Sequence, residues 1–121
     1  MKRNFDLVRK ILLKVQDLPA NSPPVCLEFP DEYDQAEVNE HVVLLIEAGL
    51  LKGKPLRAMS GLLQVTVQAL TWDGHNFIDT AKNDKIWKKA FEILKDKGID
   101  VTFDVLKGIL NSLALNAVGL K

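Results

Sequence analysis

The sequence of 121 residues is poor in the side chains that most chemistry requires, with one cysteine, two histidines and a formal net charge of zero. The single cysteine, Cys26, cannot form an internal disulfide, and nothing at the N-terminus resembles a secretory signal peptide. No apolar run approaches the length of a membrane span. A zero net charge gives no overall attraction to nucleic acid or to an anionic membrane. We therefore expect a cytoplasmic protein that does not bind membranes.

Candidate catalytic and metal-binding residues are few. His41 follows Glu37 by four residues and His75 precedes Asp79 by four, but such helical pairs are more often surface or capping contacts. Neither histidine belongs to a spaced set of cysteines and histidines, so we expect no metal site. Cys26 would act as a nucleophile only if His41 lay beside it, and a glycine-rich phosphate loop is absent. The sequence therefore predicts no enzyme activity, no cofactor and no small-molecule substrate.

The overall amino-acid composition, with 47% apolar and 26% charged residues, is typical of one soluble globular domain. The charges are segregated along the chain. Residues 25–50 carry seven acidic side chains and no Lys or Arg, whereas residues 51–70 carry three basic side chains and no acidic one. This segregation bears on the choice of partner more than the total charge does.

The first third of the chain predicts a helix, a loop and a short strand. Asn4 is a suitable N-cap for a helix over residues 4–17, whose apolar residues recur at helical spacing. Prolines mark the following loop. Residues 25–29 are a strand candidate, which Pro30 ends.

The central helix is expected over residues 35–48. Asp34, with Glu37 three residues later, forms a variant of the capping box, and both carboxylates suit the positive end of the helix dipole. Gly49 follows the last periodic residue, where a left-handed conformation favours a residue without a Cβ.

A hairpin is expected next. Residues 50–56 are extended, and residues 63–69 alternate between apolar and polar side chains, as a half-buried strand does. The residues that mark a loop are Gly53, Pro55, Ser60 and Gly61.

The last part of the chain predicts three helices. Thr71 caps the first, the second begins near Asp84 and ends at Gly98, and Thr102 caps the third. The side chains expected to be buried in the first two are Trp72, Phe77, Ile78, Ala81, Ile86, Trp87, Ala90, Phe91 and Leu94.

Three stretches resemble a known family. They are the opening Met-Lys-Arg-Asn-Phe-Asp-Leu-Val-Arg-Lys-Ile-Leu, then His41-x-x-x-Leu-Ile-Glu-Ala-Gly-Leu50, and then Leu70-Thr-Trp-Asp-Gly-His-Asn-Phe77. In this order they are similar to the bacterial and phage proteins grouped as domain of unknown function 2513, from residue 1 to about residue 115. The resemblance implies a winged-helix-like fold and a frequent origin in prophage or mobile DNA. Because the family has no assigned activity, it implies no catalytic or binding residues.

The expected fold class is therefore α+β and mostly helical, a winged-helix-like domain with a two-stranded wing and a helical C-terminal extension. We expect one domain over residues 1–121, with the winged-helix core over 1–82 and the extension over 83–121. One departure from winged-helix regulators is expected. Those proteins usually place a separate short helix before the recognition helix, whereas residues 19–33 predict loop and strand.

The leading prediction is a non-enzymatic accessory protein or transcriptional regulator, of phage or mobile-element type, that binds double-stranded DNA. In helix-turn-helix proteins the start of the recognition helix contacts base edges, while Lys and Arg neutralise phosphates. Gln35 and Asn39 lie at the start of the central helix and could pair with adenine, although their acidic neighbours would repel phosphate. Lys52, Lys54 and Arg57 lie where a wing would contact the DNA backbone.

The alternative is a protein-interaction or homodimerisation module without nucleic-acid binding. The last helix, 103–118, is apolar nearly all round, so it is either buried more fully than a small core requires or forms an interface. The candidate dimer-interface residues are Leu106, Ile109, Leu110 and Leu113. The competing interpretation is that this helix closes the core of a monomer.

Overall fold

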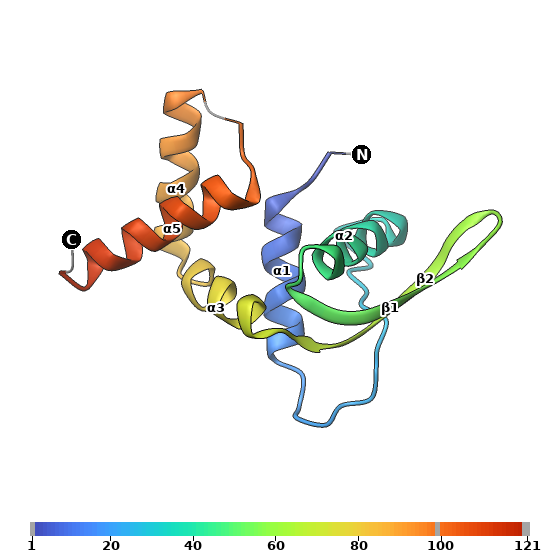
Figure 1. The fold of residues 1–121 in the computed structure, drawn as a ribbon. Coiled ribbons are helices and arrows are strands. Elements are labelled where there is room, and N and C mark those ends of the chain that lie inside the picture. Colours follow the sequence, from blue (N-terminus) through green and yellow to red (C-terminus); the bar gives the residue numbers. More distant parts are fainter. Residues whose placement is uncertain (1, 99, 120–121) are drawn as a thin grey trace. The chain divides into compact units, whose positions relative to one another are not determined.

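The computed structural model describes residues 2–98 and 100–119. These residues form five helices and one two-stranded antiparallel sheet, an α+β and mostly helical fold with the winged-helix-like arrangement that the sequence predicts (Figure 1). They divide into two compact units, one ending at His75 and the other beginning at Asn76. The expected subdivision into a winged-helix core over 1–82 and an extension over 83–121 stays a prediction. None of the helices in the described residues has the length and apolar character needed to cross a membrane.

Helix α1 (Phe5–Gln16) begins where the sequence predicts. The Asn4 Oδ1 atom accepts hydrogen bonds from the backbone N–H groups of Asp6 and Leu7 at 3.0 and 3.2 Å. This side chain thereby satisfies two of the amides that the first turn of a helix leaves without a partner. The predicted N-cap is confirmed.

Helix α2 (Gln35–Glu47) matches the predicted central helix, and Gly49 follows it with the expected left-handed backbone (φ +80°). Asp34 occupies the N-cap position but makes no side-chain capping hydrogen bond. The predicted capping box is therefore wrong. The Asp34 carboxylate instead stays exposed, where it still lies at the positive end of the helix dipole.

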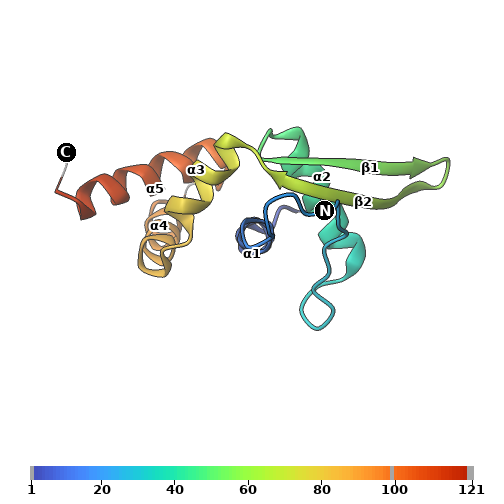
Figure 2. The ribbon, with the colours of Figure 1, turned by 90° about the horizontal axis from the view of Figure 1, so that it is seen from below.

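The first unit buries α1 and α2 against the hairpin that follows them (Figure 2). Each helix presents an apolar face, and burial of these faces supplies most of the stability of an amphipathic helix. The buried residues of this unit are Leu7, Val8, Ile11, Leu12, Val15, Leu27, Val38, Val42, Val43, Leu45, Leu50, Leu51, Val65, Val67 and Leu70, together with His41.

The hairpin, called the wing below, consists of β1 (Leu51–Ala58) and β2 (Gly61–Leu70) joined by a turn at Met59 and Ser60. Gly53 and Pro55, which were predicted to mark a loop, lie within β1, and the extended stretch predicted over residues 50–56 is confirmed. A Cβ at Gly53 would lie 2.2 Å from the Thr66 carbonyl oxygen, so this glycine marks a close approach of the two strands. Proline is compatible with a strand at the edge of a sheet.

The strand predicted over residues 25–29 does not form. Val25 alone bridges to Val67, through a pair of backbone hydrogen bonds of 2.9 and 2.7 Å. The next carbonyls are taken by side chains, since Gln35 donates to Leu27 and Lys14 donates to Glu28. A single turn over 29–33 then leads into α2, where the sequence predicted loop or strand.

The second unit contains α4 (Asp84–Lys97) and α5 (Phe103–Ala117), which pack against each other. Gly98 ends α4 with φ +63°, and the Thr102 hydroxyl accepts from the Val105 N–H at 3.3 Å, both as predicted. The cap of α4 is Asn83, one residue before the predicted start. The buried residues of this unit are Phe77, Ile78, Ala81, Trp87, Ala90, Leu94, Leu106 and Leu110.

Two aromatic predictions need correction. Trp72, in the first turn of α3 (Trp72–Ala81), was expected to be buried but is 82% exposed. Trp72 and Ala81 are nine residues apart, and at 100° per residue they lie on opposite sides of the helix, so one apolar environment cannot cover both. In α4, Ile86 and Phe91 are half-buried rather than buried.

Candidate nucleic-acid interface

The outer surface of α2 is acidic. Glu40 and Glu47 are exposed and Glu37 is half-buried, and within the described residues none of the three has a basic partner. Duplex DNA carries two negative charges per base pair, so a helix with this surface is repelled from a groove lined by phosphates. The structure therefore places α2 in the position of a recognition helix without the charge that such a helix needs.

The two predicted base-reading residues contact each other. The Gln35 Nε2 atom donates to the Asn39 Oδ1 atom at 2.8 Å and to the Leu27 carbonyl at 2.9 Å. Pairing with adenine requires a free amide donor and acceptor on one side chain. Base reading by Gln35 or Asn39 would require breaking the contacts that fix the loop before α2.

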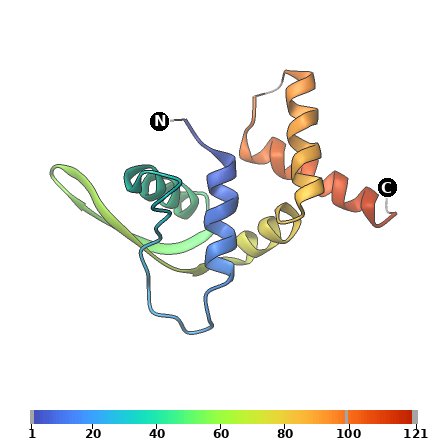
Figure 3. The same ribbon diagram turned by 180° about the vertical axis from the view of Figure 1, so that it is seen from behind.

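The predicted wing residues have a different environment. Lys52, Lys54 and Arg57 are all exposed, and in the described part of the chain no acidic side chain contacts them. Lys52 and Lys54 face the uncharged residues Ala69 and Thr66 on β2. Figures 1 and 3 show that the wing extends beyond the helices of its unit. The wing therefore presents three cations on a projecting hairpin.

The cations of α1 are partly engaged within the unit. Lys10 forms an ion pair with Glu32, and this hydrogen bond raises the pKa of Lys10. The Lys14 Nζ atom donates to the Glu28 carbonyl at 2.6 Å and lies 4.6 Å from the centre of the Phe29 ring. These two lysines fix the loop before α2, which leaves the wing as the best-placed set of available cations.

His41, which sequence reasoning weighed as a catalytic candidate, is fully buried. Its Nε2 atom accepts from the Asn4 N–H at 2.8 Å, and its Nδ1 atom lies 2.8 Å from the Glu37 carbonyl oxygen. Only a neutral ring with its proton on Nδ1 makes both hydrogen bonds. We call this set (Asn4, Glu37 and His41) the His41 junction, and it ties the start of α1 to the first turns of α2.

A second set of contacts ties the end of α2 to the start of α3. The Thr71 hydroxyl donates to the Gly49 carbonyl at 2.6 Å and accepts from the Gly74 N–H at 3.0 Å. A Cβ at Gly74 would lie 2.1 Å from the Leu50 carbonyl oxygen, so the two backbones meet there directly. We call this set (Gly49, Leu50, Thr71 and Gly74) the Thr71 junction. The three stretches that resemble the family therefore meet at two structural contacts, the His41 junction and the Thr71 junction.

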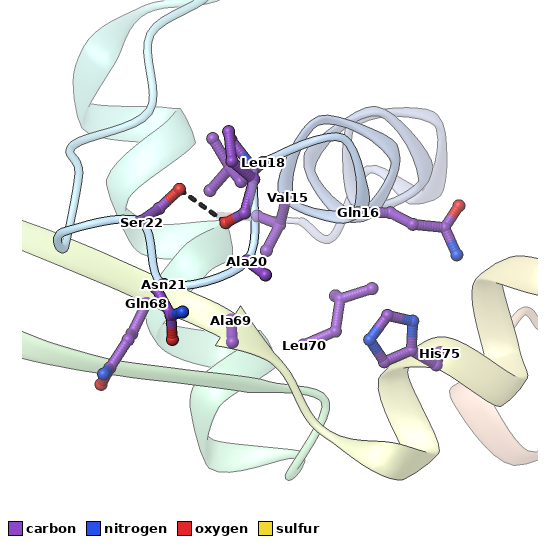
Figure 4. Close-up of a pocket in the computed structure, with 11 residues that line it drawn as sticks. Val15, Gln16, Leu18, Ala20, Asn21, Ser22, Gln68, Ala69, Leu70 and His75 are labelled. Atoms are coloured by element: carbon purple, nitrogen blue, oxygen red, sulfur yellow. Dashed lines mark hydrogen bonds between the residues drawn. The ribbon is translucent and has the colours of Figure 1, made fainter.

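An open cavity of about 430 Å³ lies between the end of α1, the following loop and the end of β2 (Figure 4). Ala69 and Leu70 form an apolar middle, and amides or an imidazole lie to either side, from Asn21, Gln68 and His75. No carboxylate, thiol or amine lines it. The lining can donate and accept hydrogen bonds, but the Ser22 hydroxyl donates to the Pro19 carbonyl at 2.8 Å rather than to the His75 ring.

The predicted dimer-interface residues divide into two pairs. Leu106 and Leu110 are fully buried within the unit, and Ile109 and Leu113 are half-buried. The apolar side chains that α5 and its C-cap expose most are Leu115 and Val118, at 47% and 71%. The dimer itself stays a prediction.

Sequence reasoning placed Met59 alone at an exposed position in the wing loop and missed the apolar side chains around it. Leu56, Met59 and Leu63 project around the wing turn, with Met59 fully exposed and the other two about half exposed. The signal that could have found them is the absence of any charged residue but Arg57 over residues 55–63. Within the described residues, no group of three or more His, Cys, Asp or Glu side chains is placed to hold a metal ion.

These features define the class of protein. Two helices, the second ending in a glycine turn, followed by a projecting antiparallel hairpin, form a winged-helix-like domain. The chain belongs to the family of hypothetical proteins called DUF2513, which it matches over residues 2–100, and the predicted family resemblance is confirmed. It is also similar to an uncharacterized protein of Haemophilus influenzae, with 29% identity over 113 residues, 93% of this chain and 95% of the relative. No solved structure matches it.

Proposed function

We propose that this protein binds duplex DNA through its wing and acts as a non-enzymatic accessory or regulatory protein. The observation that carries the proposal is the set of three exposed cations, Lys52, Lys54 and Arg57, on a projecting hairpin without a single acidic residue. Cations in this arrangement can approach phosphates without an acidic neighbour competing for them. The phage or mobile-element setting rests on the family resemblance alone.

The same charge distribution argues against base recognition by α2. Phosphate contacts position a protein on DNA, whereas sequence is read by contacts to base edges. The acidic surface of α2 is repelled by phosphates, and Gln35 and Asn39 are hydrogen-bonded to each other. We therefore expect binding that is independent of sequence and weak, with a dissociation constant of about 10⁻⁴ to 10⁻⁶ M at physiological salt.

The experiment that tests this proposal compares two triple variants in a fluorescence anisotropy titration with a labelled duplex. The wing variant carries Lys52→Gln, Lys54→Gln and Arg57→Gln. It should lose at least about tenfold in affinity, because each lost cation removes one phosphate contact. The matched control carries Lys85→Gln, Lys88→Gln and Lys89→Gln on α4, all exposed lysines of the second unit.

The control has the same net charge as the wing variant but an intact wing. If binding depends on the wing, the control should keep the affinity of the wild type within about twofold, apart from the general effect of net charge. Equal losses in both variants would show that total charge rather than the wing determines binding, and would contradict the proposal.

The second candidate is a homodimerisation module that uses α5. It is favoured by the exposure of Leu115 and Val118, because exposed apolar residues close together are typical of an interface. Leu115→Lys with Val118→Lys should then abolish a dimer without unfolding the protein, since neither side chain is buried. Sedimentation velocity of this double variant against the wild type measures the effect.

A further inference from the structure

The apolar side chains at the wing turn are not needed for phosphate binding. Leu56 and Leu63 are 51% and 57% exposed, and Met59 is fully exposed. Exposed apolar groups placed together mark a contact surface more often than single ones do. With the neighbouring Arg57 they form a surface, called the wing tip below, that is both apolar and cationic.

A surface with the opposite charge lies on the loop before α2. Glu28, Asp31 and Asp34 are exposed, and in the described part of the chain no cation pairs with their carboxylates. Between them lie Phe29 and Tyr33, both half-buried, with their rings edge to face at 6.2 Å. We call residues 28–34 the acidic loop.

Two lysines of α1 also face the acidic loop. Lys10 pairs with Glu32 and lies 5.4 Å from the centre of the Tyr33 ring, while Lys14 lies over the Phe29 ring. The charge of Lys10 is neutralised by Glu32. Lys14 is then the one lysine that faces the three unpaired carboxylates of the loop. The acidic loop therefore keeps a negative charge around a partly exposed aromatic pair.

The wing tip and the acidic loop complement each other in two ways. The wing tip carries the Arg57 cation beside apolar side chains, with Lys52 and Lys54 farther along β1. The acidic loop carries carboxylates around aromatic rings. Methionine sulfur makes favourable contacts with aromatic ring edges, and Met59 is the most exposed side chain of the wing tip. Opposite charges around an apolar contact favour one register over others.

We propose that the wing tip of one copy docks on the acidic loop of a second copy of this chain. The two surfaces do not meet within one copy, because Figure 2 shows the loop before α2 and the wing turn apart from each other in the same unit. Each copy carries one surface of each kind, so a two-fold pair satisfies both, and two-fold dimers are the commonest closed assembly. DNA phosphates and the second copy compete for the same wing cations.

The test is a charge-swap experiment by sedimentation equilibrium at low salt and high micromolar concentration, without DNA. The wing-reversed variant carries Lys52→Glu, Lys54→Glu and Arg57→Glu. The loop-reversed variant carries Glu28→Lys, Asp31→Lys and Asp34→Lys, all at exposed positions whose carboxylates form no ion pair within the described residues. Wild-type protein should associate, and each variant alone should be monomeric.

An equimolar mixture of the two variants should associate again, because the acidic wing of one then meets the basic loop of the other. Recovery in the mixture cannot result from unfolding of either variant. Because the two variants carry opposite net charges of −6 and +6, the recovered association should also persist at about 0.15 M salt, where attraction between charges more than about 8 Å apart is largely screened. A wild type that is monomeric under these conditions, or variants that associate as strongly as the wild type, would overturn the proposal. So would loss of association only in the Leu115→Lys, Val118→Lys variant, which would place the interface on α5.

A third variant separates this proposal from the proposed DNA binding. Met59→Ser leaves every charge in place, so duplex binding should be unchanged, while self-association should weaken about fivefold or more through loss of the apolar contact. The loop-reversed variant should bind DNA at least as tightly as the wild type, because it keeps the wing cations and gains positive charge. If self-association follows these expectations but no variant binds DNA, the proposed function fails and the interface stands.

Discussion

The His41 and Thr71 junctions and the wing belong to the same unit, but their polar groups are in opposite environments. In the junctions the polar atoms are hydrogen-bonded within the chain, as in the two bonds of the buried His41 ring. On the wing, Lys52 and Lys54 are exposed and lack an acidic partner in the described residues. A buried satisfied group fixes a fold, whereas an exposed unpaired cation is available to a partner. The residues of the two junctions therefore stabilise the fold, and the wing is the element that we propose binds a partner.

The largest loss of stability is expected from His41→Ala, which removes the central side chain of the His41 junction. The substitution removes a fully buried ring and leaves the Asn4 N–H without its acceptor. A cavity and an unpaired donor together should lower the free energy of unfolding by about 3–4 kcal/mol. Urea unfolding followed by circular dichroism measures this loss.

The other histidine supplies the matched control. His75 is exposed, so His75→Ala should change the free energy of unfolding by less than about 0.5 kcal/mol. Equal effects of the two substitutions would show that the His41 junction does not stabilise the unit.

A slightly smaller loss is expected from Gly74→Ala. The new Cβ would lie 2.1 Å from the Leu50 carbonyl oxygen, so the backbones at the Thr71 junction would have to separate. Overpacking of this kind should cost about 3 kcal/mol. Gly108→Ala on α5 is the control: nothing lies within 4 Å of its Cβ, and alanine should stabilise the helix by up to about 1 kcal/mol. In thermal unfolding, the melting temperature should fall for Gly74→Ala and rise for Gly108→Ala. A Gly74→Ala protein as stable as the wild type would contradict the close approach of the two backbones.

Thr71→Ala should have an intermediate effect. It removes the cap of α3 and the hydrogen bond to the Gly49 carbonyl, for a loss of about 1–2 kcal/mol. Thr71→Ser keeps the hydroxyl and should recover most of this stability. If serine and alanine destabilise equally in chemical denaturation, the hydroxyl is not the stabilising group.

The smallest effect on stability is expected from the wing. Replacing Lys52, Lys54 and Arg57 by glutamine removes no contact within the described residues, so the free energy of unfolding should change by less than about 0.5 kcal/mol per position. A cooperative loss of several kcal/mol in denaturant titrations would show that the wing cations stabilise the unit, and the contrast with the junctions would fail.

Sequence patterns predicted the elements whose signals are local. Asn4, Gly49, Gly98 and Thr102 were identified as helix ends because the chemistry of a cap involves only neighbouring residues. Asp34 is the exception, since an N-cap position does not ensure that its side chain turns toward the free amides.

The wrong predictions share a cause: the contact that determines the structure at each position comes from a residue distant in the sequence. Gly53 was assigned to a loop because glycine is common in turns, whereas the approach of Thr66 from the other strand explains it. The residues after Val25 failed to form a strand because Gln35 and Lys14 occupy the carbonyls that pairing would use. His41 likewise could not be recognised as a structural residue, because its partner Asn4 lies 37 residues away.

The environment of the candidate contact residues could be predicted only in part, for the same reason. The exposure of Lys52, Lys54 and Arg57 follows from a charged hairpin that no helix covers, and the structure bears out their exposed position. The pairing of Gln35 with Asn39 and with the Leu27 carbonyl could not be predicted, because it depends on the path of the loop before α2.

The measurement that tests the central claim most directly is the salt dependence of duplex binding by the unmodified protein, on two unrelated sequences. If three wing cations each neutralise one phosphate, the logarithm of the association constant should fall with the logarithm of salt concentration with a slope of about −2.7, equally for both sequences. A slope near zero, or an affinity that differs greatly between the two sequences, would contradict an interface made of wing cations and phosphates.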